Sequence, residues 1–87
     1  MLHARTDYDR IQDPAGLIPA DEPVFLIRGK DLVGPATVEA WANLAAMAGA
    51  EPEIVELARR QARRMTEWQQ RSGCQVPDMP VGAGRKG

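Results

Sequence analysis

A run of arginines in the second half of the chain is the feature most able to do chemistry. Arg59, Arg60, Arg63 and Arg64 lie within six residues, and Trp68 follows four residues after Arg64. Residues four apart share a row on a helix, so we expect Arg60 and Arg64 to stand together beside Trp68. Guanidinium groups match phosphate oxygens, and an aromatic ring stacks on a base. The pattern predicts an anion site, with a solvated helix face held by ion pairs as the alternative.

A turn in the first half of the chain adds to this candidate site. Arg28 and Lys30 flank Gly29 at the end of a predicted strand. Side chains and backbone amides of such a turn can approach a phosphate, and a simple polar strand exit is the alternative. If the two predicted helices pack on the strand, this turn could meet Arg60 and Arg64 across two copies of the chain. Tyr8 offers a second aromatic ring for stacking on a base.

The residues that catalytic and metal sites require are isolated. The chain has one histidine (His3) and one cysteine (Cys74), and no serine elbow, phosphate loop or helical metalloprotease motif occurs. Asp7, Asp9 and Asp13 resemble part of a calcium loop that lacks its glycine and its distal glutamate. We therefore expect no enzymatic activity, no metal and no cofactor.

Length, composition and charge bound the class of protein. The chain has 87 residues, of which 44% are hydrophobic and 26% charged, as in a single small globular domain. A lone cysteine, no apolar leader and no membrane-spanning run predict a cytoplasmic protein. The pI near 5.7 argues against duplex nucleic acid as partner. The net charge is −6 before residue 59 and +5 from there on, which favours pairing between copies or binding of an anion.

Three elements must position these residues. A strand is expected at 24–28, because the run is β-branched and aromatic and lies between Pro23 and Gly29. Helices are expected from Pro35 to about residue 48 and from Pro52 to about residue 71, each ended by a glycine. Their short link predicts an antiparallel hairpin. The predicted fold is mainly α, a β-α-α unit over 23–72, with an irregular arm at 1–22 and a flexible tail at 73–87.

Apolar stripes on the two predicted helices define the expected core. The first helix presents a wide stripe, which indicates contact with more than one neighbour, and the second presents a narrow one. The stripes consist of Val38, Trp41, Leu44, Ala45 and Ala48, and of Ile54, Leu57, Ala58, Ala62, Met65 and Trp68. We expect Trp41 and Trp68 to meet in one core between the helices.

A single chain gives this fold a small core and an unpaired strand. Its backbone groups need partners, which residues 17–18, residues 75–77 or the strand of a second copy could supply. About 50 ordered residues rarely make a stable core alone. We therefore predict a homo-oligomer, most simply a dimer, joined through Phe25, Ile27 and part of the first helix. The alternative is a monomer whose N-terminal segment folds over the strand.

Residues 21–31, with the sequence DEPVFLIRGKD, precede the Trp-containing helix. Over about residues 7–70 the chain resembles short accessory proteins of unassigned function from bacterial phages and prophages. The resemblance implies a phage-encoded protein in the host cytoplasm, and no functional residue is carried over from it. Such proteins often inhibit a host protein, and some sequester nucleotide immune signals.

Two functions remain open from the sequence. The first is a non-enzymatic counter-defence protein, an oligomer that sequesters an anionic nucleotide signal. Its ligand-binding residues would be Arg28, Lys30, Arg60 and Arg64 for phosphate, with Trp68 or Tyr8 for a base. The alternative is a protein-binding inhibitor or adaptor that acts on a host defence complex, as anti-CRISPR proteins do. It would use the acidic arm of Asp7, Asp9 and Asp13 or a charged helix face.

Overall fold

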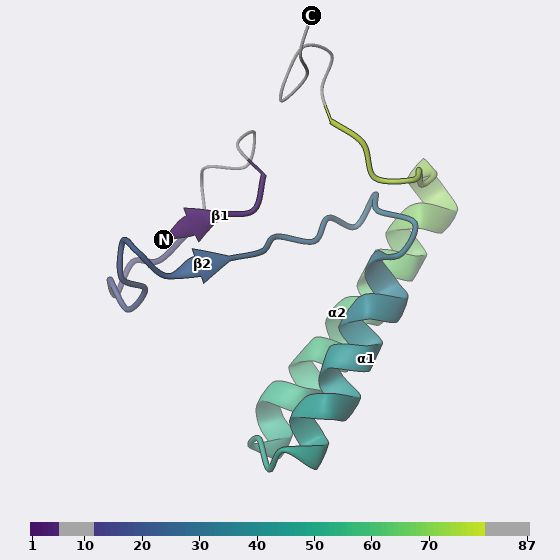
Figure 1. Cartoon of the computed structure of the whole chain (residues 1–87). Helices are drawn as coiled ribbons and strands as arrows, with labels where there is room; N and C mark the ends of the chain where they lie inside the picture. The colour runs from purple at the N-terminus through teal and green to yellow at the C-terminus, as the bar shows by residue number, and fades with distance from the viewer. Residues whose placement is uncertain (6–11, 80–87) are drawn as a thin grey trace, which may run out of the picture. The chain divides into compact units, whose positions relative to one another are not determined.

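The computed structural model describes residues 1–5 and 12–79, with the element order β1, β2, α1, α2 (Figure 1). The chain forms two compact units, residues 1–26 together with the chain from Asp78 on, and residues 27–77. The first unit holds the two strands and the second holds the helical hairpin. The mainly helical β-α-α fold predicted from the sequence is confirmed.

The first unit is built on one short parallel ladder. β1 (Leu2–His3) pairs with β2 (Pro23–Val24), with His3 opposite Val24. The Leu2 N–H donates to the Glu22 carbonyl at 2.6 Å, and the Ala4 N–H to that of Val24 at 3.2 Å. β1 therefore lies inside the segment that the sequence predicts as irregular.

The strand predicted at 24–28 is wrong in its extent. β2 begins at Pro23 and has only two residues, and the chain from 25 on leaves the ladder. The Arg28 carbonyl instead accepts from the Asp31 N–H at 3.1 Å in a tight turn. The local propensity of the apolar run is high, but β1 offers a partner only two residues long, so the ladder ends there.

Asp13 organises the connection between the two strands. Its carboxylate accepts from the backbone N–H groups of Leu17 and Ile18 at 3.1 and 3.0 Å. Its carbonyl accepts from Gly16, which has a φ of 64° that suits glycine. The Asp13 carboxylate is therefore used inside the turn rather than presented on an acidic arm, and Asp7 and Asp9 lie outside the described residues.

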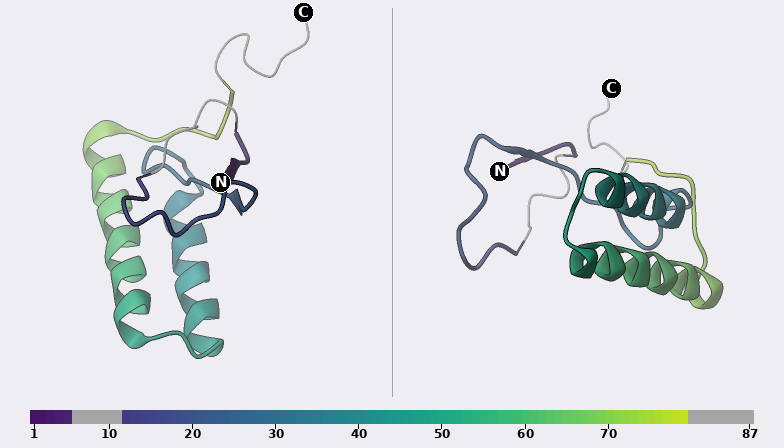
Figure 2. Two further views of the ribbon diagram at one scale, coloured as in Figure 1. Left: turned by 90° about the vertical axis from the view of Figure 1, so that its left-hand side faces the viewer. Right: turned by 90° about the horizontal axis from the view of Figure 1, so that it is seen from below.

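The second unit is an antiparallel pair of helices, seen side by side in Figures 1 and 2. α1 (Gly34–Met47) and α2 (Pro52–Ser72) both have a proline in the first turn, where its missing N–H costs nothing. Two residues after the end of α1, Gly49 has a φ of 88°, and the Ala50 N–H then donates to the Ala45 carbonyl at 2.9 Å. α2 ends at Gly73, with a φ of 86°. The predicted helix bounds are confirmed to within a residue or two.

The core between the helices is small, and half of its residues are alanines. The buried hydrophobic residues are Ala42, Val55, Ala62 and Met65. The prediction that Trp41 and Trp68 meet in this core is wrong, because they are 49% and 38% exposed. Contact through alanines brings two helices close together and leaves no room for an indole between them. The rotation of the helices buries Val55 and Met65 and leaves both tryptophans exposed.

The base of the hairpin is closed by two glutamines. The Gln69 side-chain amide on α2 donates to the carbonyls of Gly29 and Asp31, both at 2.8 Å. Gln75, just after α2, pairs with Asp31 in an isolated parallel bridge. The turn that precedes α1 is therefore tied to the far end of α2, and part of the predicted flexible tail takes part in regular pairing.

Candidate functional site

The four clustered arginines divide into two pairs with different surroundings. Arg59 reaches across the hairpin and donates from Nη2 to the Asn43 Oδ1 at 3.1 Å. Arg63 pairs with Glu56, with 3.2 Å between Nη2 and Oε1. Within residues 1–5 and 12–79, no ion pair or hydrogen bond engages Arg60 or Arg64, and both side chains are exposed.

Arg60 and Arg64 belong to a row that runs along the outer side of α2. The row consists of Glu53, Arg60, Arg64 and Arg71, separated by seven, four and seven residues, and all four are exposed. These spacings keep the side chains on one line, on the side of α2 away from buried Ala62. We call it the outer row. It is negative at its start and positive over its remaining length.

Trp68 borders the outer row, one turn after Arg64. With 38% of its surface exposed, it is the less exposed of the two tryptophans. Two guanidinium groups about 6 Å apart along the helix can each grip a phosphate oxygen pair, and an indole beside them can stack on a base. These three residues form an open surface site rather than an enclosed pocket.

The turn with Arg28 and Lys30 lies apart from this row within one chain. The backbone on both sides of Lys30 is bound by Gln69, which faces α1. Gln69 lies about 140° around α2 from Arg64 at 3.6 residues per turn. Arg28 already takes part in an interaction within the chain.

Within one chain, the two predicted groups of cations are therefore not brought together. Tyr8, the remaining predicted ligand residue, lies outside the described residues. The described candidate site thus consists of Arg60, Arg64 and Trp68.

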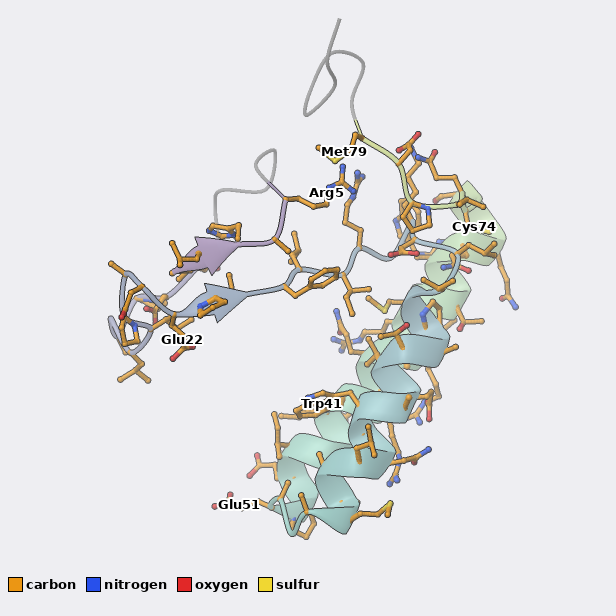
Figure 3. All side chains as sticks on the ribbon, viewed as in Figure 1. Arg5, Glu22, Trp41, Glu51, Cys74 and Met79 are labelled. Carbon is orange, nitrogen blue, oxygen red and sulfur yellow. The ribbon has the colours of Figure 1, made fainter. Side chains whose placement is uncertain are left out.

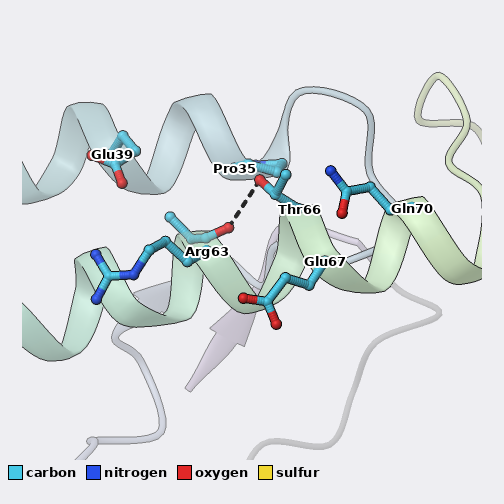
Figure 4. A pocket seen from close by; sticks show the side chains of 7 residues that line it. Pro35, Glu39, Arg63, Thr66, Glu67 and Gln70 are labelled. Carbon is cyan, nitrogen blue, oxygen red and sulfur yellow. Dashed lines mark hydrogen bonds between the residues drawn. The ribbon is translucent and has the colours of Figure 1, made fainter.

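The polar face of the hairpin carries a groove that sequence reasoning missed (Figure 4). It is shallow, with a volume of about 240 Å³, and lies between α1 and α2. It is lined by Pro35, Glu39, Ala62, Arg63, Thr66, Glu67 and Gln70. Two carboxylates and an arginine already paired with Glu56 make it a poor site for an anion. In the sequence, this face is indicated by the polar residues at 59, 63, 66 and 70, whose spacing places them on one side of the second helix.

The opposite face of the hairpin is apolar. Its large side chains are Trp41, Leu44, Ile54, Leu57 and Trp68, and all are exposed. Leu44 is 64% exposed, and Trp41 stands out on α1 in Figure 3. We call this surface the apolar face. The hairpin thus separates a polar face, an apolar face and the outer row of α2.

Two further classes of site are absent from the part of the chain that the structure describes. No group of three or more histidines, cysteines or carboxylates there could hold a metal ion. No helix there is both long and apolar enough to cross a bilayer. No protein-family model, curated protein or solved structure matches the chain, so the candidate site is argued from its geometry.

Proposed function

We propose that the protein is a small non-enzymatic binding protein that holds a phosphate-bearing nucleotide on Arg60 and Arg64, next to Trp68. The observation that supports it is the contrast between the two arginine pairs. Arg59 and Arg63 are bound to Asn43 and Glu56, whereas the described structure gives Arg60 and Arg64 no partner.

Long cationic side chains placed on consecutive turns of one helix offer donors to a ligand at a fixed spacing. Hydrogen bonds to charged groups are each worth about 1.5–3 kcal/mol, so two of them give useful affinity for a small anion. The candidate site has no nucleophile paired with a base. We therefore propose that the ligand is held and released unchanged. In the phage context that the sequence resemblance implies, this amounts to sequestering a nucleotide signal.

The test is a titration of the full chain with cyclic AMP, ATP and cyclic di-GMP, followed by calorimetry and by tryptophan fluorescence. We expect the double variant Arg60→Gln/Arg64→Gln to bind the best of these probes at least ~10-fold more weakly, as loss of a charged hydrogen bond implies. The matched control is Arg59→Gln/Arg63→Gln, which removes the same charge from the polar face. Equal weakening by both double variants, or no binding of any probe, would overturn the proposal.

A protein partner is the second candidate, supported by the groove and the mixed charges on the polar face. Glu39, Arg63 and Glu67 present both signs around a shallow depression, which suits the rim of a protein interface. Here the test is capture of a partner from host lysate by the tagged chain. We expect one stoichiometric protein that is lost with Glu39→Lys/Glu67→Lys and kept with Arg60→Gln/Arg64→Gln. Capture that is indifferent to the first double variant would remove this candidate.

A further inference from the structure

The helical hairpin leaves most of its large apolar side chains exposed. Two of its four buried hydrophobic residues are Ala42 and Ala62, whereas two tryptophans and three large aliphatic residues lie on the apolar face. A single core in a unit of 51 residues rarely supplies more than about 3–5 kcal/mol of stability. The apolar face therefore leaves five large apolar side chains for a partner to cover.

The area of the apolar face matches the centre of a protein interface. Five large side chains about half exposed present on the order of 500 Å², taking roughly 200 Å² for each when fully exposed. A stable interface covers about 800 Å² on each partner, with an apolar centre and a polar rim. The rim here is the outer row on one side and the end of the hairpin near Glu51 and Glu53 on another.

Two antiparallel copies of α2 would bring apolar residues together and opposite charges together. On the apolar face, Ile54 and Trp68 lie at equal distances from Gln61. On the outer row, Glu53 and Arg71 lie at equal distances from residue 62. A two-fold axis near residue 61 would place Ile54 against Trp68 of the partner subunit and Glu53 near Arg71 of the partner subunit. A parallel arrangement would place like charges at both ends instead.

We propose that a second copy of this chain docks on the apolar face, giving a two-fold four-helix dimer in which the two α2 helices run antiparallel. The interface is isologous, as in most homodimers, and a hairpin closed at one end by a short link is the natural half of such a bundle. This interface is formed by the helical hairpin, whereas the sequence predicts one through Phe25, Ile27 and part of the first helix. The dimer does not depend on the proposed ligand.

Light scattering and sedimentation of the full chain, without nucleotide, test the interface. We expect a dimer of twice the 9.5 kDa chain at micromolar concentration. Leu57→Lys should raise the dissociation constant of the dimer at least 30-fold. The matched control Ala46→Lys, on the polar side of α1, should leave it within three-fold. A monomer at 100 µM would overturn the proposal. The apolar face would then have to be covered by residues of the same chain.

Two measurements keep the test decisive if Leu57→Lys fails to fold. Gln61→Glu places two like charges at the axis and should weaken the dimer about five-fold or more, and Gln61→Leu should tighten it. A spin label on Cys74, the one cysteine and an exposed one, reports the orientation. Cys74 lies just beyond α2, whose last residue, Ser72, is 11 residues from the axis, so at 1.5 Å rise per residue the two labels should be at least about 33 Å apart. A separation below about 20 Å, or no effect of either Gln61 variant, would refute the antiparallel dimer.

Discussion

Replacing Gln69 with methionine tests the contact that joins the two ends of the hairpin. The side chains have similar length and shape, but methionine has no amide to donate to the carbonyls of Gly29 and Asp31, both at 2.8 Å. Each hydrogen bond contributes about 0.5–1.5 kcal/mol net, so losing both costs about 1–3 kcal/mol. A domain of this size loses about 4–8 °C in Tm per kcal/mol, which predicts a fall of roughly 5–20 °C.

Thermal unfolding followed by circular dichroism at 222 nm measures this fall, at one fixed protein concentration so that association does not differ between samples. The matched control is Gln70→Met, one residue later on the exposed polar face. Surface substitutions of this kind stay within about 0.5 kcal/mol. If Gln69→Met and Gln70→Met unfold together, the two hydrogen bonds do not hold the turn on α2 and the reasoning is refuted.

Three further predictions concern the turn before α1, the strand connection and the ligand. Gly34→Ala would place a Cβ 2.9 Å from the Arg28 carbonyl, so it should destabilise the hairpin by about 1–3 kcal/mol in urea titrations, and an unchanged midpoint would contradict this. Asp13→Ala removes the acceptor of two backbone N–H groups. It should speed amide exchange of residues 17 and 18, measured by NMR, while α1 and α2 keep their protection. Cyclic di-GMP at saturating concentration should lower the dissociation constant of the dimer, measured by sedimentation. An unchanged constant would show that ligand binding and dimerisation are independent.

Local signals in the sequence were sufficient to predict the hairpin. Within a helix, Pro35 and Pro52 fit only the first turn, and the glycines at 49 and 73 adopt positive φ just after each helix. These features depend on one or two residues each and on no distant contact. The pairing of β1 with β2 had no such signal, because two residues of strand are too few to show alternation and the partners lie 21 residues apart.

The rotation of each helix about its axis could not be read from its apolar stripe. Val55 and Ala42, which are buried, are as apolar as their exposed neighbours. The apolar pattern is therefore compatible with packing of the two helices through either edge of each stripe. Close packing through alanines decides between the edges, and that is a property of both helices together. Helical spacing did predict that Arg60 and Arg64 stand together. It did not predict which arginines Asn43 and Glu56 bind, since the first contact depends on the rotation and the second on a reach of seven residues.

The apolar face and the outer row follow from the same rotation of α2. Turning α2 by about a quarter turn to bury Leu57 and Trp68 against α1 would carry Arg59 away from Asn43 and swing Arg60 and Arg64 onto the apolar face. The rotation that the structure has instead keeps the large apolar side chains on a face where a second copy can cover them. It also leaves the two arginines on a flank that such a dimer does not bury.

In an antiparallel dimer with its axis near residue 61, Arg60 and Arg64 of both copies lie on one side of the bundle, close to that axis. Four guanidinium groups then repel one another unless an anion lies among them. A ligand that binds there has a higher affinity for the dimer than for the monomer, so by linkage it must stabilise the dimer. This is the reason for expecting cyclic di-GMP to tighten association. It also implies that Leu57→Lys, which keeps every arginine, weakens ligand binding.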